Sequence, residues 1–467
     1  MDQRLVLKLI PAITAVAAVA VLVHWLAARP AGRDLQPRLP GQDNVKALEA
    51  PAVDLRGAFA TGPGRPADLP GSWPRFRGER FDAVGRDSVP LARRWRAGAP
   101  ARLWSVELGE GYGGPAVLGG RVYVLDYDQQ RKADALRCLS LADGREIWRH
   151  SYEIEISRNH GITRTVPAVT ERWVVSLGPK CHVICLDSTT GSFKWGIDLV
   201  RQYRTTVPPW YAGQCPLIDD GKAIIAPAGE ALMIAVDCET GNVVWTTPNP
   251  RGWEMTHSSV VPMMFQGKRT YVYCGSGGVV GVSAEDGSIV WDTTAWKVSM
   301  ANVPTPIVVG DDRLFLCGGY GAGAMMLRLE ESAGKIVANE LFRLKPEVFG
   351  AEQQTPVLYQ NHIYGVIPNG QLVCIDLEGT VRWTSGPKNR YGLGPYIVAD
   401  GMLILMNDHG VLSLVEATEK AFQPLASAKV FEDGHEAWGP LALVAGRLLA
   451  RDMNHLICVD LRKASHE

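Results

Sequence analysis

The stretch CLDSTTGSFKW, residues 185–195, contains a short apolar strand, a polar turn, a glycine and a tryptophan four positions after that glycine. Five such units occur along the chain, at Gly144/Trp148, Gly191/Trp195, Gly241/Trp245, Gly287/Trp291 and Gly379/Trp383. A strand-rich unit that recurs at a period of about 40 to 50 residues is typical of a radial or solenoid repeat architecture. Apolar strands bounded by glycine at this period favour a β-propeller.

A second repeated element precedes each of these units. It consists of a short apolar strand, a polar turn and another apolar strand, as in GPAVLGGRVYVLD from Gly114. The turns carry glycine and aspartate, the residue types that tight hairpins need. Together the two elements predict four antiparallel strands per unit. Eight copies of the second element predict eight blades, starting near Gly114, Val166, Cys215, Ser259, Thr305, Thr355, Gly394 and Gly439.

The eighth unit ends at LICVDL without a strand that carries tryptophan, whereas ARLWSVEL, with Trp104, stands alone before the first unit. We therefore predict that this N-terminal segment forms the outer strand of the last blade and closes the ring. The fifth and seventh units lack the tryptophan, and we expect Phe342 and Phe422 to replace it. The tryptophans themselves are predicted to pack between neighbouring blades.

The N-terminal region differs from the repeats. Residues 9–28 form a nearly continuous apolar run preceded by Arg4 and Lys8, which predicts an uncleaved transmembrane anchor over residues 1–29 with a cytoplasmic N-terminus. Residues 30–72 contain seven Pro and six Gly and predict a disordered linker. The propeller is expected over residues 73–462 and a short tail over 463–467. This organisation places the propeller in the periplasm or another extracytoplasmic space.

Composition and motifs exclude several functions. A formal charge of −1 gives no basic field for nucleic acid. The chain has no Gly-x-Ser-x-Gly elbow, zinc-binding His-Glu-x-x-His helix or phosphate-binding loop. Several cysteines recur at equivalent strand positions of different repeats, so we predict buried apolar roles for them rather than disulfides. We therefore predict no catalytic residue and no metal site.

The loops that enter the innermost strands are the candidate binding site, since they line one mouth of a propeller's central channel. Among their residues, Arg164, His257, Glu352 and Glu436 supply both charge signs and one group able to titrate near neutral pH. Two readings stay open: a solvated channel without a ligand, and a site for a small molecule or peptide. His160 either joins this funnel or caps a long loop. The candidate residues are Tyr112, Arg164, Gln214, His257, Asn302, Glu352, Gln353, Glu436 and Trp438.

The recurring apolar-Asp-x-x-x-Gly-x-x-x-Trp pattern resembles the tryptophan-docking repeats of the pyrroloquinoline quinone (PQQ)-like propeller superfamily, over about residues 73–462. The segment WPRFRGERFDAVG, from Trp73 to Gly85, resembles the lead-in of many bacterial members. One branch comprises quinoprotein dehydrogenases, which bind PQQ and Ca²⁺ in the funnel. Another comprises cofactor-free propellers such as the lipoprotein of the outer-membrane β-barrel assembly machinery. This chain has neither the vicinal cysteine pair of many quinoproteins nor a lipidation cysteine near its N-terminus.

The resemblance and the residues together imply a membrane-tethered, monomeric, non-enzymatic scaffold that binds a protein or complex of the cell envelope. This interpretation needs no cofactor. The alternative is a PQQ-dependent alcohol or sugar dehydrogenase, with Glu352 or Glu436 as metal ligand or base and Arg164 at the quinone oxygens. A small-ligand sensor is a third possibility, although no output module is visible.

Overall fold

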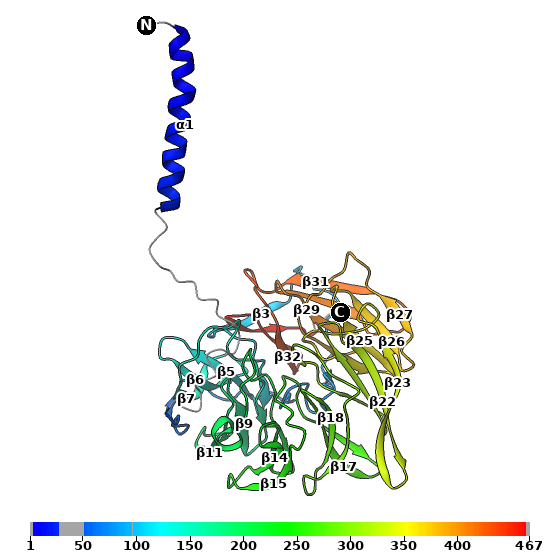
Figure 1. Ribbon diagram of the computed structural model, residues 1–467. Helices are drawn as coiled ribbons and strands as arrows, with labels where there is room; N and C mark the ends of the chain where they lie inside the picture. The colour runs from blue at the N-terminus through cyan, green and yellow to red at the C-terminus, as the bar shows by residue number, and fades with distance from the viewer. Residues whose placement is uncertain (1–2, 28–50, 96, 464–467) are drawn as a thin grey trace. The chain divides into compact units, whose positions relative to one another are not determined.

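The computed structural model describes residues 3–27, 51–95 and 97–463 (Figure 1). The chain divides into two compact units, residues 1–42 and 43–467, and each is described by itself. The first unit contains one helix, α1 (Gln3–Ala27). The described residues of the second unit form 34 strands and one short helix, α2 (Leu199–Tyr203).

Helix α1 covers the apolar run at the N-terminus. Nine of its large apolar side chains are exposed, including Trp25 at 71%. Among the described residues, however, no helix combines enough length with enough hydropathy to cross a bilayer. The helix expected at this place is therefore present, but the transmembrane span is not confirmed.

The second unit is an all-β propeller of eight antiparallel sheets, as the repeats predict. Blade 1 contains β4 (Ala116–Leu118), β5 (Arg121–Asp128), β6 (Ala133–Ser140) and β7 (Glu146–Glu153); blade 2 contains β8 (Ala168–Val169), β9 (Trp173–Leu177), β10 (His182–Asp187) and β11 (Phe193–Asp198); blade 3 contains β12 (Leu217–Asp219), β13 (Lys222–Ile225), β14 (Ala231–Asp237) and β15 (Val243–Pro248); blade 4 contains β16 (Val261–Phe265), β17 (Lys268–Gly275), β18 (Gly278–Ser283) and β19 (Ile289–Thr293). Blade 5 contains β20 (Ile307–Val309), β21 (Arg313–Gly318), β22 (Gly323–Ser332) and β23 (Lys335–Leu344); blade 6 contains β24 (Val357–Tyr359), β25 (His362–Val366), β26 (Leu372–Asp376) and β27 (Val381–Thr384); blade 7 contains β28 (Tyr396–Ala399), β29 (Met402–Met406), β30 (Val411–Glu416) and β31 (Pro424–Lys429); blade 8 contains β32 (Gly439–Val444), β33 (Arg447–Arg451), β34 (His455–Asp460) and β3 (Ala101–Glu107).

The first strand of each blade lies innermost. Around the ring, β4 of the first blade contacts both β8 of the second and β32 of the last. Middle strands are buried on both faces because a blade packs on each side: six of the seven residues of β14 are buried. The core therefore consists of apolar layers between adjacent blades.

The recurring glycine and tryptophan join neighbouring blades, as predicted. At four joins the tryptophan ring of one blade, from Trp104, Trp148, Trp195 or Trp245, packs on the turn glycine of the next, which has a positive φ: a Cβ on Gly191 would lie 2.7 Å from the Trp148 ring. Five of the six tryptophans at this position also donate their indole N–H to a carbonyl of the next blade, whereas the buried Trp291 indole nitrogen has no hydrogen-bond partner in the described chain. These hydrogen bonds run from Trp104 to Leu141 (3.0 Å), Trp148 to Thr189 (3.1 Å), Trp195 to Cys238 (2.9 Å), Trp245 to Ala284 (3.2 Å) and Trp383 to Thr418 (2.8 Å).

The two blades without the tryptophan differ from each other. Phe342 pairs with Met326 directly beside the bulge of its outer strand, the register that tryptophan holds elsewhere, and packs on Gly379. Phe342 thus replaces the tryptophan. The same prediction for Phe422 is wrong, because Ala426 holds that register in blade 7. Phe422 instead packs on the Trp383 ring, with the ring centroids 5.9 Å apart.

The predicted ring closure is confirmed. Strand β3, with Trp104, pairs antiparallel with β34, so that the last blade combines one N-terminal and three C-terminal strands. Trp104 pairs with Cys458 and donates to blade 1 across the join. All nine cysteines of the chain are free and buried.

The linker prediction is wrong for residues 51–72, and residues 29–50 lie outside the described part of the chain. Strand β1 (Ala58–Thr61) pairs with the outer strand of blade 1, placing Ala58 opposite Ser151 and Thr61 opposite Trp148. Leu55 is buried, and its carbonyl lies 3.0 Å from the ring nitrogen Nε2 of His150. Strand β1 is therefore a fifth strand of the blade 1 sheet. It pairs with backbone groups of β7 that would otherwise be exposed at the edge of the sheet.

Candidate functional site

The lead-in segment, residues 73–85, crosses the centre of the ring. Trp73 exchanges two backbone hydrogen bonds of 2.8 Å with Val117 of blade 1, and Pro74 accepts one from Val169 of blade 2. At its other end β2 (Val84–Gly85) runs parallel to β28 of blade 7. The segment thus closes the channel beside the inner strands.

Two arginines fasten the middle of this segment to other blades. Arg75 donates to the Ile218 carbonyl of blade 3 at 3.3 Å. Arg77 is buried and donates to the carbonyls of Thr355 and Pro356, before the inner strand of blade 6, at 3.0 and 2.9 Å. Burial lowers the pKa of Arg77 to about 10, so the guanidinium stays charged at neutral pH.

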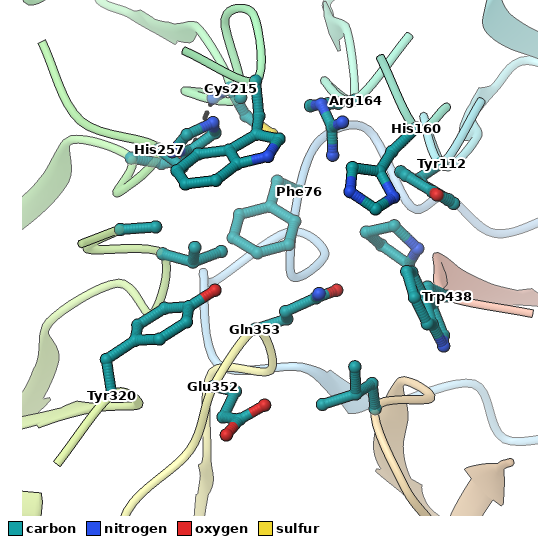
Figure 2. A pocket seen from close by; sticks show the side chains of 17 residues that line it. Phe76, Tyr112, His160, Arg164, Cys215, His257, Tyr320, Glu352, Gln353 and Trp438 are labelled. Atoms are coloured by element: carbon teal, nitrogen blue, oxygen red, sulfur yellow. Dashed lines mark hydrogen bonds between the residues drawn. The ribbon is translucent and has the colours of Figure 1, made fainter. Parts of the chain in front are cut away.

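The lead-in segment turns the channel into a cup, because Phe76 lies in the middle of the cavity (Figure 2). The cup opens on the entry face, which we define as the end of the propeller where the loops before the inner strands lie. Its volume is about 310 Å³. The lining residues are Phe76, Tyr112, His160, Arg164, Trp210, Gly213, Cys215, His257, Ser259, Ala301, Val303, Tyr320, Glu352, Gln353, Leu393, Trp438 and Pro440.

Arg164 supplies the one arginine of the described lining. Its guanidinium lies over the Tyr112 ring, 5.0 Å from the centroid, and donates to the Asn159 carbonyl at 3.3 Å. The buried Nε has no hydrogen-bond partner in the described chain. Burial lowers the pKa of Arg164 to about 10, which leaves the side chain cationic at neutral pH.

His257 faces the same cavity but is uncharged there. Burial, assisted by the nearby Arg164 charge, lowers the pKa of His257 to about 3. Its Nε2 is buried without a hydrogen-bond partner among the described residues. A neutral imidazole with an unpartnered nitrogen can donate to or accept from a bound polar group.

One wall of the cup is an aromatic network. The rings of Tyr112 and Trp438 lie 5.1 Å apart, and the Trp438 indole donates to Asp408 at 2.8 Å. The Tyr112 hydroxyl donates to the Glu436 carboxylate and accepts from the Gly161 backbone at 3.1 Å. Desolvation and the Glu436 hydrogen bond raise the pKa of Tyr112, so its hydroxyl keeps its proton and donates a hydrogen bond to the Glu436 carboxylate.

Six of the nine predicted site residues line the cup: Tyr112, Arg164, His257, Glu352, Gln353 and Trp438. Gln214 does not, because its buried amide pairs with both backbone groups of Ala226, at 3.2 and 2.9 Å. Asn302 is also buried outside the lining, and its carbonyl accepts from the His257 backbone. Glu436 is also outside the lining, and its carboxylate accepts the hydrogen bond from the Tyr112 hydroxyl of the cup wall.

Sequence reasoning missed Phe76, Trp210 and Tyr320 among the lining residues. Phe76 belongs to a lead-in without repeat periodicity, and Trp210 to a connection between blades 2 and 3 that also forms α2. Tyr320 lies in the turn between β21 and β22, which is on the entry face because the strands of a blade alternate in direction. That alternation was a usable signal for Tyr320. His160, left undecided by the sequence, lines the cup.

The cup does not fit the Ca²⁺ that the enzyme branch of the superfamily would require. Ca²⁺ takes six to eight oxygen ligands, usually including several carboxylates. Glu352 is the one carboxylate in the described lining. The described residues also contain no cluster of three or more His, Cys, Asp or Glu side chains arranged to hold a metal ion. The donors present suit an organic ligand better than a cation.

Comparison with known proteins places this geometry in a family. Residues 131–385, more than half of the 467, match the family described as "Outer membrane protein assembly factor BamB". No curated protein sequence matches the chain. The expected resemblance to PQQ-like repeat propellers is confirmed.

Solved structures share the fold at low identity. BamB from Moraxella catarrhalis has a TM-score of 0.54 and 15% identity, with 77% of this chain and 100% of that chain covered. The computationally designed Ika8 protein has a TM-score of 0.50 and 10% identity, with 77% and 99% covered. Quinohemoprotein alcohol dehydrogenase from Comamonas testosteroni has a TM-score of 0.45 and 13% identity, with 85% and 81% covered. At these identities the likeness concerns the fold alone.

Proposed function

Since this chain belongs to the family described as outer membrane protein assembly factor BamB, we propose that it is a non-enzymatic propeller scaffold that binds a protein of the cell envelope. The observation that carries the proposal is the entry face. There two large exposed side chains lie at an aromatic cup: Tyr320 in its wall is 41% exposed, and Met300, next to the lining residue Ala301, is 59% exposed. Exposed aromatic and methionine side chains around a pocket are typical of protein-binding surfaces.

An envelope location is part of this proposal. The family description and the nine exposed apolar side chains of α1 support it. An apolar helix that finds no core to cover it gains free energy by resting in the interfacial layer of a membrane. Protease treatment of intact cells and of spheroplasts tests the location: the propeller should be digested only after the outer barrier is opened. Digestion that also requires lysis of the inner membrane would contradict it.

Site-specific photocrosslinking in living cells tests the scaffold function. A photoreactive amino acid at Met300 should yield one dominant crosslinked partner protein. The matched control position is Asp220, whose side chain is 89% exposed in the β12–β13 turn at the opposite end of the propeller. Equal crosslinking from both positions, or none from Met300, would refute binding at the entry face.

A further inference from the structure

Arg164 is a partly buried cation that contacts the Asn159 carbonyl and the Tyr112 ring but forms no direct ion pair with a carboxylate of the described chain. The Glu436 carboxylate, which accepts the Tyr112 hydroxyl, attracts the guanidinium only through space. Figure 2 shows the guanidinium pointing into the cavity. A partly desolvated cation gains most from an anionic group that enters the same low-dielectric space. The cup therefore favours a ligand with a carboxylate.

The rest of the cup favours a planar apolar group beside that carboxylate. Phe76, Tyr112, Trp210, Tyr320 and Trp438 all lie in its lining. A volume of about 310 Å³ accommodates one large side chain with the backbone next to it. Rings that pack edge to face or offset contribute free energy beyond the burial of area.

A second cavity of about 410 Å³ continues from the cup across blades 6 and 7. It shares Glu352 and Leu393 with the cup and adds Arg390 and Asp408, among others. Three charged residues without an ion pair in the described chain lie along this path: Arg164 in the cup, Glu352 at the junction and Arg390 in the second cavity. Asp408 of the second cavity also has no ion pair there, but its carboxylate accepts hydrogen bonds from the Trp438 indole and the Leu393 backbone. A cup that continues into a second cavity, which we call the groove, fits an occupant that extends from one into the other better than a molecule confined to one of them.

We propose that the cup and groove bind an extended segment of the partner protein, in which an acidic residue adjoins an aromatic one. The acid pairs with Arg164, the ring packs against Phe76, and a following basic residue meets Glu352 where the segment leaves the cup. This proposal rests on the scaffold function and names the chemistry of its partner. It requires no covalent step.

Selection from a random heptapeptide library tests the proposal on the full-length protein in detergent micelles. Selected peptides should share an acidic residue next to an aromatic one. In binding measurements, Arg164→Gln should weaken such a peptide at least tenfold, on the order expected for a charge-assisted hydrogen bond. Replacing the peptide's acid by its amide should cause a similar loss, and combining both changes should add little, as expected for groups that contact each other.

Arg172→Gln is the matched control, because Arg172 also lies over an aromatic ring, Trp173 at 4.6 Å, at the opposite end of blade 2. It should change affinity less than twofold, and both variants should unfold at the same urea concentration as the native protein. The proposal is overturned by selected peptides that lack the acid, by the absence of any shared pattern, or by binding insensitive to Arg164→Gln. Phenylacetate binding as tightly as the peptide would also overturn it, in favour of a small aryl acid. If Met300 still crosslinks its partner in the Arg164→Gln variant, the scaffold function is supported. Only the proposed recognition of an acidic residue by Arg164 is then refuted.

Discussion

Replacing Arg451 with methionine is expected to loosen the join between the first and last blades. Arg451 is 1% exposed on β33 of blade 8. Its guanidinium donates to the carbonyls of Gly109, Gly113 and Leu125 at 2.9, 2.8 and 2.9 Å, all on the blade 1 side of the join. Two of these carbonyls flank Tyr112 in the loop that forms the cup wall.

The magnitude follows from what the substitution leaves behind. Methionine fills much of the volume but donates no hydrogen bond, so three carbonyls lose their partner at about 1–3 kcal/mol each. Part of this loss is offset because the cost of burying a cation disappears, a cost seen in the lowering of the Arg451 pKa to about 10. A net loss of about 3 kcal/mol in the free energy of unfolding is expected.

Urea unfolding followed by tryptophan fluorescence measures this loss, and amide hydrogen exchange locates it. Exchange should accelerate most in residues 109–113 and in β3, which close the ring. Arg447→Met is the control, because Arg447 lies on the same strand, is partly exposed and has one long contact, 3.5 Å to the Leu141 carbonyl. If Arg451→Met is as stable as Arg447→Met, or if residues 109–113 keep their protection, the join does not depend on these hydrogen bonds.

Three further outcomes are expected. Gly191→Ala should lower the free energy of unfolding by about 2–3 kcal/mol, because φ is +73° and the new Cβ would lie 2.7 Å from the Trp148 ring. Gly310→Ala is the control, since φ is +63° but no atom of a non-adjacent residue lies within 4 Å of the new Cβ. It should lower the free energy of unfolding by only about 1 kcal/mol in the same urea titration. Burial raises the pKa of Asp134 to about 7, whereas an unfolded aspartate titrates near pH 4. Its contribution to stability is therefore full below about pH 4 and is lost as the pH rises to about 7. Asp134→Asn keeps an acceptor for the Tyr152 hydroxyl, which lies 2.5 Å from Asp134, and should remove about 2–4 kcal/mol of the change in the free energy of unfolding between these pH values. An unchanged pH dependence of that free energy would contradict the assignment. Finally, protein incubated with PQQ and Ca²⁺ should retain no quinone absorbance after gel filtration and should not oxidise alcohols with a dye acceptor, since the described lining offers one carboxylate; retained quinone would restore the enzyme alternative.

Much of the ring follows from local sequence. Each repeat contains its own strands, turn, glycine and tryptophan, so the number of blades and the closing role of Trp104 follow from a pattern within about 50 residues. The same pattern located Phe342 but misplaced Phe422, because the outer strand of blade 7 takes its register from the bulge and not from the spacing of aromatic residues.

The cup depended on contacts that no local pattern contains. The loops before the inner strands were predictable as a set, yet the tertiary structure directs Arg164 and His257 into the cavity and uses Gln214 to pair with backbone. Phe76 and strand β1 lie in segments without periodicity, whose hydrogen-bond partners come from other blades. Repetition encodes the ring because each unit meets similar neighbours. The site instead combines loops from several blades with Phe76 of the non-repeating lead-in segment, and only the closed ring brings these residues together.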